Sequence, residues 1–500
     1  MRSVNGHYLA KLLGAWNAGT DNSSTYARLA AAIRMLLLDG RLPLATRLPG
    51  ERELATTLGV SRTTITAAYG TLREDGYADS RRGSGTWTTL PPSPVSTIPF
   101  APAPEGADVI DLAHASPSAP ATALREAYEW ALQQLPHFVA GHGYSLYGIE
   151  QLRDAIAARY TSRGLATTPD QILVTAGAQH AFSLAMSLIA SPGDRALVEH
   201  PTYPNALDAM RRAQLRPVPV PLTGTPSAGA SVVPDNVRGS AAPDGWDVEA
   251  VEAALRQTAP RIAYLNPDFQ NPTGLLASDA ERQALAAALS KSRTRTVIDE
   301  TLVELDLEGG EMPAPLATYL PERLAITTGT ASKTFWGGIR VGWLRADPAT
   351  VRNLAAIRAT VDNSTAMIEQ LAVTHLLGRL DDVLPTRRAE LAAQRNTLVA
   401  AIGERLPMWH GRTPRGGQVM WYDIGAPVSS ALAAAGDRHG IRLAAGPRFG
   451  VDGAFERWLR VPFTLPSDVL SDAVDRIAAA FHDVSATTPD TTSQFVDTFA

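Results

Sequence analysis

Between residues 108 and 483, short strand-like segments alternate with helix-like segments, and this alternation constrains the fold more than any other feature of the chain. Strands that alternate with helices usually pair in parallel, because each helix carries the chain back across the sheet. The pattern therefore predicts an α/β domain with a mainly parallel sheet. Its clearest examples are QILVTAG with AQHAFSLAMSLI, then RALVEHP, RIAYLNP, TRTVIDE and RLAITTGT.

A proline-rich stretch separates this region from the N-terminal part of the chain. Residues 90–107 contain six prolines and show no periodicity, which is typical of a semi-extended linker. The sequence thus predicts several parts, which are a leading amphipathic helix in residues 1–20 with the stripe Leu9, Leu12, Leu13 and Trp16, a small domain in 21–89, the linker in 90–107, the α/β domain in 108–483 and a flexible, Thr-rich tail in 484–500.

Composition excludes several classes of protein. The 500 residues include no cysteine, so disulfides, zinc knuckles and thiol catalysis are excluded. No stretch reaches the roughly 18 consecutive apolar residues of a membrane helix, and the N-terminus lacks the pattern of a signal peptide. We therefore expect a cytoplasmic protein with no membrane partner. Residues 1–89 carry 11 basic and 7 acidic side chains, a net charge of +4, and the overall charge of −5 leaves −9 for the rest of the chain. Any polyanion is therefore expected to bind at this basic N-terminal part.

Lysine is rare in this chain. Of the 45 basic side chains only Lys11, Lys291 and Lys333 are lysines. Lys333 lies between Ser332 and Thr334 in a Gly-rich apolar stretch. A lysine amine can deprotonate and form a Schiff base, whereas an arginine guanidinium cannot. The pattern indicates that an amine is needed at Lys333.

Residues 51–89 predict a helix-turn-helix followed by a hairpin. A short helix from Glu51 to Leu58 is followed by a turn, and Ser61 is placed to cap a second helix that reaches about Asp75. The exposed N-terminal end of that second helix would enter the major groove of DNA. Taken singly, each of these polar side chains could equally be an ordinary surface residue, but the ordered set favours DNA binding.

These segments closely resemble the GntR-type winged helix over residues 25–89, in LPGERELATTLGVSRTTI and GYADSRRGSGTW. One departure is Gly50, where the family usually has Ser, so a weaker helix cap is expected there. The resemblance implies phosphate or base contacts from Arg52 and Arg62, a recognition helix lined by Ser61, Thr63, Thr64 and Thr66, and a basic wing tip formed by Arg81, Arg82 and Gly83.

Polar side chains follow several predicted strands where they end. Asp299 ends the strand TRTVI, and Asn271 lies in the loop NPDFQNPTG after another strand. Ligands of open α/β sheets bind at the carboxyl ends of the strands, and a buried carboxylate favours a cationic partner. Free N–H groups at a helix start near Ala178 and Gln179 suit a phosphate, as do Thr330 and Arg340, which flank Lys333, while Tyr203 could stack on a flat ring.

The motifs NPTG, DE after a strand, and SK followed by GGIRVGW resemble fold-type I pyridoxal-phosphate (PLP) enzymes over about residues 108–483. The resemblance implies a large α/β domain, a smaller C-terminal α+β domain and PLP as cofactor. It further implies that Lys333 forms the internal aldimine, Asp299 pairs with the pyridine nitrogen, Asn271 contacts the ring oxygen, Tyr203 stacks, and Ala178, Gln179, Thr330 and Arg340 hold the phosphate.

Two more residues take expected roles from this resemblance. Tyr144, in YSLYGIEQLR, matches a tyrosine that reaches the phosphate of the neighbouring subunit, which implies a homodimer. Arg460, in WLRVPF, matches the arginine that clamps an amino-acid carboxylate. One departure is Thr301. The family commonly has a tyrosine shortly after the aspartate, and this tyrosine donates a hydrogen bond to the ring oxygen. Efficient transamination is therefore not expected.

Together the two halves resemble the MocR/GabR family of transcription regulators. We accordingly predict a regulator that binds operator half-sites on double-stranded DNA and senses PLP or an amino compound. Two alternatives remain open, namely a catalytically active aminotransferase that carries a DNA-binding domain, and a regulator that has lost its cofactor.

Overall fold

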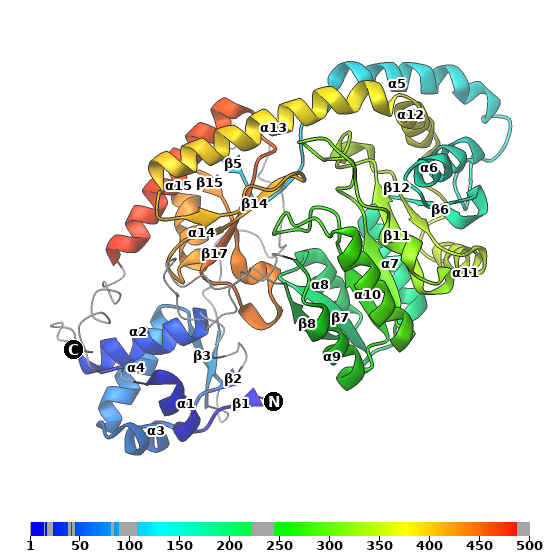
Figure 1. The fold of residues 1–500 in the computed structure, drawn as a ribbon. Coiled ribbons are helices and arrows are strands. Elements are labelled where there is room, and N and C mark those ends of the chain that lie inside the picture. Colours follow the sequence, from blue (N-terminus) through cyan, green and yellow to red (C-terminus); the bar gives the residue numbers. More distant parts are fainter. Residues whose placement is uncertain are drawn as a thin grey trace.

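The computed structural model describes residues 2–14, 16–17, 24–38, 42, 46–81, 85–89, 108–222 and 245–487. The N-terminal ranges form a winged-helix unit, and residues from 108 onward form a two-part body (Figure 1). The proposed linker, 90–107, lies outside the described residues. No helix within the described ranges is long and apolar enough to cross a membrane.

The N-terminal unit packs its helices against a small sheet of strand order β1-β2-β4-β3. The strands β3 and β4 form the antiparallel hairpin expected from the sequence, with Ala78 opposite Thr88. The elements are α1 (Gly6–Leu13), α2 (Thr25–Leu38), α3 (Glu51–Leu58), α4 (Arg62–Glu74), β1 (Arg2–Ser3), β2 (Thr46–Arg47), β3 (Ala78–Arg81) and β4 (Gly85–Thr88).

The leading helix α1 belongs to this unit. Leu9 and Leu13 are buried in the same cluster as Leu54 of α3. The backbone N–H of Gly6 donates to Glu53 Oε1 at 2.6 Å, and a side chain at Gly6 would come within 2.7 Å of Thr57 Oγ1. The sequence did not reveal the partner of this helix, and the structure identifies it as α3.

The larger part of the body is built on a seven-stranded sheet of order β6-β12-β11-β10-β9-β7-β8. All neighbouring strands are parallel except β12, which runs antiparallel to both β11 and β6. This mainly parallel sheet was predicted from the alternation of strands and helices. The strands are β6 (Ile172–Thr175), β7 (Arg195–His200), β8 (Arg216–Pro221), β9 (Ile262–Leu265), β10 (Arg295–Asp299), β11 (Ala325–Thr330) and β12 (Gly342–Arg345).

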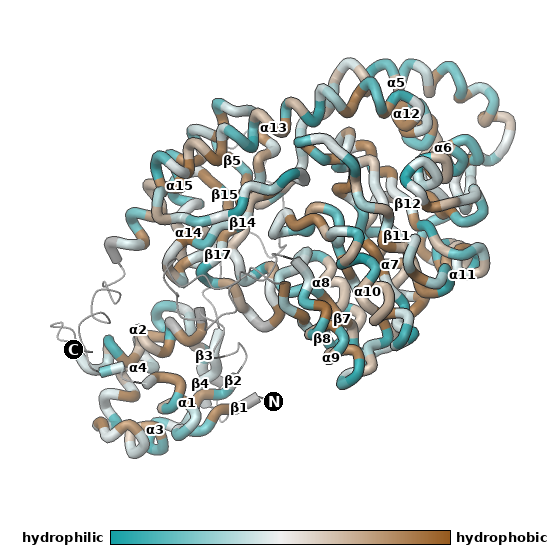
Figure 2. The backbone as a smooth tube through the Cα atoms, in the orientation of Figure 1, coloured by the Kyte–Doolittle hydropathy of each residue, from teal (hydrophilic) through white to brown (hydrophobic). Residues whose placement is uncertain are grey.

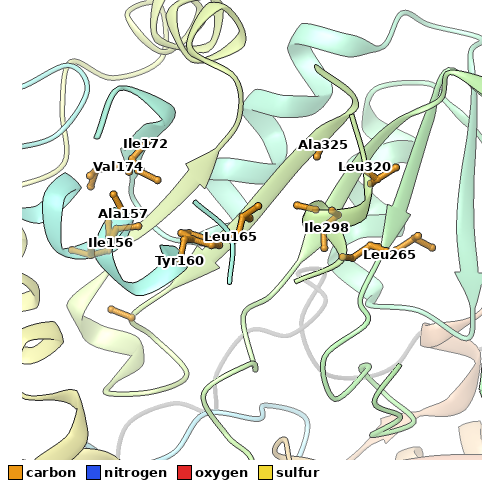
Figure 3. Close-up of a cluster of buried hydrophobic side chains, with 14 of the residues drawn as sticks. Ile156, Ala157, Tyr160, Leu165, Ile172, Val174, Leu265, Ile298, Leu320 and Ala325 are labelled. Carbon is orange, nitrogen blue, oxygen red and sulfur yellow. The ribbon is translucent and has the colours of Figure 1, made fainter. Parts of the chain in front are cut away.

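Helices cover both faces of this sheet. Because successive strand side chains point to opposite faces, Ile298 and Leu265 join one apolar cluster (Figure 3), whereas Val297 and Tyr264 join the other. Figure 2 shows hydrophobic and hydrophilic residues alternating along outer helices such as α5, as expected where one helix face is buried. The helices are α5 (Ala121–Gln134), α6 (Glu150–Ser162), α7 (Ala178–Ile189), α8 (Pro204–Arg212), α9 (Val248–Thr258), α10 (Asp279–Ser292), α11 (Pro348–Arg358) and α12 (Met367–Gly378).

The smaller part contains an antiparallel sheet of order β13-β14-β17-β16 and its covering helices. A separate two-stranded pairing brings β5 (Ile110–Asp111), at the start of the body, beside β15 (Ile441–Arg442). The first residues of the body are therefore attached to its C-terminal part. The remaining elements are α13 (Leu380–Arg405), α14 (Ser429–Arg438), α15 (Ser467–Thr487), β13 (His410–Gly411), β14 (Val419–Asp423), β16 (Ala444–Ala445) and β17 (Trp458–Pro462).

Candidate functional site

A cavity of about 370 Å³ lies where β9, β10 and β11 end, and its walls come from both parts of the body. The structure brings nine of the sequence-predicted residues together in its lining, although they are spread over almost 300 positions of the chain. These residues are Ala178, Gln179, Tyr203, Asn271, Asp299, Thr330, Lys333, Arg340 and Arg460.

Lys333 follows β11 and presents its amine to this cavity. Nζ donates to the backbone carbonyl of Ala115 at 2.6 Å. The pKa of Lys333 is lowered to about 8, first by burial and next by the positive charge of Arg460, which outweighs the opposing effect of Asp299. At pH 7 roughly one amine in ten is therefore neutral, and the neutral form is the one that attacks a carbonyl carbon.

Asp299 presents its carboxylate at the end of β10. Its Oδ2 accepts from Tyr264 Oη at 2.6 Å and its Oδ1 accepts from the backbone N–H of Thr301 at 3.0 Å. Two donors fix the orientation of this carboxylate, which suits it to a cationic N–H in the cavity. Sequence reasoning missed Tyr264. It lies on β9 opposite Val297 of β10, so only the strand pairing brings it to Asp299.

The start of α7 and Arg340 form an end of the cavity suited to an anion. Gly177 is the N-cap residue of α7 and has a φ of 95°. No side chain among the described residues caps the first N–H groups of this helix. Arg340 Nη2 donates to the Ala176 carbonyl at 2.7 Å, and a side chain at Gly177 would come within 2.8 Å of that nitrogen. Unpaired N–H groups, the helix dipole and a guanidinium together favour a phosphate.

Tyr203 and Asn271 form part of the wall. Asn205 Nδ2 donates to Tyr203 Oη at 2.9 Å, and burial followed by the charge of Asp299 raises the pKa of Tyr203 to about 12. Tyr203 therefore stays neutral, as a stacking surface should. Asn271 Oδ1 is buried and has no hydrogen-bond partner among the described residues, so the amide retains capacity for a ligand.

Glu199 holds the loop that carries Asn271, and the sequence reasoning missed it. Its carboxylate accepts from Trp246 Nε1 at 2.8 Å, from the Asn266 backbone N–H at 3.0 Å and from Gln270 Nε2 at 3.1 Å. Burial raises the pKa of Glu199 to about 7, although the three hydrogen bonds favour the charged form. An acidic residue inside a buried strand was the available signal.

Arg460 lies on β17 and is only 3% exposed. Its Nη2 donates to the Ala113 carbonyl, and its Nε has no hydrogen-bond partner among the described residues. The guanidinium carbon lies 5.1 Å from the centre of the Phe449 ring, and burial lowers the pKa of Arg460 to about 10. The side chain stays charged at neutral pH and can accept a carboxylate in a bidentate pair.

Thr301 and Leu302 line the cavity after Asp299, where a tyrosine was expected from the family resemblance. The intervening Glu300 instead pairs with Arg163 Nη1 at 2.8 Å. The segment after Asp299 therefore supplies a threonine hydroxyl and no phenol to the cavity. Tyr144 does not line the cavity of its own chain, and it is 63% exposed.

In the N-terminal unit, Ser61 Oγ accepts from the Thr64 backbone N–H at 3.0 Å and caps α4. Arg52, Thr63 and Thr66 are exposed on α3 and α4, and Thr64 is half-buried. Arg62 is exposed too and lies 3.2 Å from Glu51 Oε2. Gly50, which precedes α3, provides no side-chain cap. Arg82, Gly83 and the side chain of Arg81 lie outside the described residues.

Comparison with known proteins identifies both halves of the chain. Residues 108–477 match the family model described as aminotransferase class I and II. The chain belongs to this family. Residues 25–87 match the model described as bacterial regulatory proteins, gntR family. These matches confirm the predicted order of a GntR-type winged helix followed by a fold-type I aminotransferase domain.

Relatives that span both halves are named as regulators. The uncharacterized HTH-type transcriptional regulator YdcR of Escherichia coli (strain K12) is 27% identical over 462 residues, which cover 87% of this chain and 94% of that protein. The probable rhizopine catabolism regulatory protein MocR of Rhizobium meliloti is 27% identical over 409 residues, with coverage of 77% and 78%. The predicted resemblance to MocR-type regulators is thus confirmed.

A solved aminotransferase shows the fold of the body. The crystal structure of LysN, an α-aminoadipate aminotransferase from Thermus thermophilus complexed with N-(5'-phosphopyridoxyl)-L-leucine, matches with a TM-score of 0.67 at 23% identity. The match covers 76% of this chain and 94% of that structure.

Proposed function

We propose that this chain is a PLP-dependent transcription regulator, which binds DNA through its winged helix and senses PLP or an amino compound in the cavity of its body. A single observation carries the proposal. One chain joins a capped and exposed recognition helix to a cavity in which Lys333, Asp299 and Arg340 converge. Relatives named as regulators align with this chain over 94% and 78% of their own length, which supports the proposal. We place the protein in the cytoplasm, where its DNA target lies.

The residues of the cavity fit PLP. Arg340, Thr330 and the α7 N-terminus at Ala178 and Gln179 would hold its phosphate, and the side-chain amide of Asn271, which lines the same cavity, would donate from Nδ2 to the ring oxygen. When bound, PLP supplies an aldehyde that reacts with primary amines. Tyr203 would cover the ring, Asp299 would stabilise a proton at the ring nitrogen, and Lys333 would hold the cofactor covalently.

The effector is proposed to carry an amine and a carboxylate. Arg460 keeps a buried guanidinium with an unpaired Nε at the wall of the cavity. A carboxylate is the acceptor that satisfies such a group best, since two charge-assisted hydrogen bonds form at once. PLP alone remains the other candidate signal, and it would leave Arg460 without a carboxylate.

We further propose a homodimer. Tyr144 is exposed and does not line the cavity of its own chain, as expected for a side chain that completes the partner's phosphate site. Sedimentation should report twice the chain mass, and Tyr144→Phe should weaken PLP binding. A monomer, or unchanged PLP affinity in the variant, would contradict this part.

Two assays test the function itself. The full-length protein should enrich a specific duplex from a random DNA library, and Arg62→Gln should abolish the enrichment. Bound PLP should give a visible absorbance band that Lys333→Ala removes. If the wild-type protein shows no such band after incubation with PLP, the result would instead favour a regulator that has lost its cofactor.

Aminotransferase activity is a second candidate function, because the cavity contains the residues that such an enzyme needs. Lys333, Asp299 and Arg460 are all present, and the structural relatives include aminotransferases. Turnover of amino donors with a keto acid, measured beside DNA selection, distinguishes the two functions. Rapid turnover without an enriched duplex would refute a regulator and favour an enzyme.

A further inference from the structure

Gln270 is a fully buried glutamine that lies directly before Asn271, in the loop between β9 and α10. Its side-chain oxygen accepts from the Thr273 backbone N–H at 3.1 Å and from Thr273 Oγ1 at 2.7 Å. Its Nε2 donates to the Pro201 carbonyl at 2.8 Å and to Glu199 Oε2 at 3.1 Å. A side-chain amide can accept two hydrogen bonds and donate two. The amide of Gln270 therefore makes every hydrogen bond that it can.

These hydrogen bonds join two segments that form the wall of the cavity. The two bonds from Thr273 close the loop that contains Asn271. The bond to the Pro201 carbonyl reaches the segment after β7, two residues before Tyr203. Asn271 and Tyr203 both line the cavity, whereas Gln270 does not. A side chain behind the wall thus connects the amide that would contact the ring oxygen with the phenol that would cover the ring.

The backbone beside Gln270 needs support from its surroundings. Phe269 has a φ of 54°, in the left-handed region that residues with a side chain rarely adopt. Such a conformation persists only where neighbouring contacts hold it, and it is typical of functional sites. On one side of Phe269, the buried ion pair between Asp268 Oδ1 and Arg282 Nη2, at 2.7 Å, holds the loop. Gln270 holds the loop on the other side.

The surroundings of this side chain require a neutral amide. The Glu199 carboxylate is fully buried, and its Oε1 already accepts from Trp246 Nε1 at 2.8 Å and from the Asn266 N–H at 3.0 Å. Its Oε2 and the Pro201 carbonyl only accept, so the side chain that faces them must donate twice. A glutamate in place of Gln270 would bring two carboxylates together, and an apolar side chain would leave buried acceptors unsatisfied.

We propose that Gln270 is a positioning residue for the cofactor, which holds the Asn271 amide at the ring oxygen of PLP and fixes its spacing from Tyr203. This inference rests on the proposed function, in which PLP occupies the cavity. A donor at the ring oxygen shares the negative charge of that oxygen, so a proton bound nearby is held less tightly. Loss of Gln270 should therefore weaken PLP binding and also raise the pH at which the visible band of the bound cofactor titrates.

Absorbance titration of the full-length protein with PLP tests the proposal in Gln270→Met, which keeps the length of the side chain and removes its hydrogen bonds. The dissociation constant of PLP should rise about tenfold, as expected when one hydrogen bond to a charged group is lost. At saturating PLP, the pH midpoint of the visible band should rise by about one unit. A general structural defect lowers the occupancy without moving this midpoint. An unchanged midpoint would therefore overturn the positioning role, even if the affinity fell.

Gln171 provides a matched control. It is a buried glutamine whose Oε1 also accepts from a threonine N–H and hydroxyl, those of Thr168, at 2.7 and 3.2 Å, and whose Nε2 also donates to a carboxylate, that of Glu322. It directly precedes β6 and does not line the cavity. Gln171→Met should lower the melting temperature, as Gln270→Met does, but leave the PLP affinity and the pH midpoint at the wild-type values. An equal rise of the midpoint in Gln171→Met would overturn the proposal.

Thr273→Val is a milder variant that decides the matter if Gln270→Met does not fold. It removes the 2.7 Å hydrogen bond from Thr273 Oγ1 to Gln270 and keeps the shape and charge of the side chain. The midpoint should rise by about half a unit, since a bond between neutral groups is roughly half as strong as one to a charged group.

The outcomes separate the inference from the function on which it rests. A wild-type midpoint in a folded, PLP-bound Thr273→Val would overturn the role of Gln270 and leave the cofactor in place. Failure of the wild-type protein to bind PLP would refute the cofactor part of the proposed function, and the inference with it.

Discussion

The pH dependence of cofactor capture should be set by the positive charge of Arg460. The pKa of Lys333 is lowered to about 8, first by burial and next by Arg460. At pH 7 about one amine in ten is then neutral, against about one in three thousand at the ordinary lysine pKa of 10.5. Removal of one neighbouring cation from a buried site should raise the pKa by about one unit.

Arg460→Gln is therefore expected to slow the covalent capture of PLP about tenfold at pH 7. The sign follows from the neutral amine being the reactive form, so the rate rises with pH until the amine is fully deprotonated. The midpoint of the rate profile should move upward by about one pH unit in the variant. Above both midpoints the two rates should converge, which separates a pKa effect from damage to the site.

Stopped-flow absorbance after mixing with PLP, repeated from pH 6 to pH 10, measures this profile. Arg457→Gln is the matched control, because Arg457 lies three residues away and is 42% exposed in an ion pair with Asp423. Its profile should coincide with that of the wild type. An unchanged midpoint in Arg460→Gln, or a tenfold deficit that persists at high pH, would refute the electrostatic reasoning.

Three further outcomes are expected. Ser61→Ala removes the cap that accepts from the Thr64 N–H at 3.0 Å, so thermal melting should show a loss of about 1 kcal/mol in the N-terminal unit, whereas Ser61→Asn should keep most of this stability. Arg52→Gln should lower the slope of log affinity against log salt by about one if this residue contacts a DNA phosphate, and an unchanged slope would remove it from the interface. Tyr264→Phe deletes the 2.6 Å hydrogen bond to Asp299 and should weaken PLP binding by roughly tenfold, since a bond to a charged group contributes about 1.5–3 kcal/mol; equilibrium titration with PLP measures it, and equal affinities would deny Tyr264 any part in holding that carboxylate.

Local signals in the sequence located most of the candidate site. Asp299 could be placed at a strand end because a β-branched run precedes it, and Lys333 because it follows another such strand. The cap at Ser61 and the hairpin of β3 and β4 were also predictable. Periodicity, capping and turn chemistry act within a few residues, so a sequence displays them directly.

Contacts between distant segments were decided only by the tertiary structure. Tyr264 reaches Asp299 because β9 pairs with β10, and Ala113 and Ala115 reach Arg460 and Lys333 because β5 pairs with β15. The sequence predicted a mainly parallel sheet but not the order of its strands. It also did not predict that the leading helix α1 packs against α3. Strand order, register and docking depend on how whole elements share a core, and no local pattern records that choice. The sequence by itself thus determined which side chains lie at the ends of the strands. The tertiary structure determined which backbone carbonyls contact these side chains.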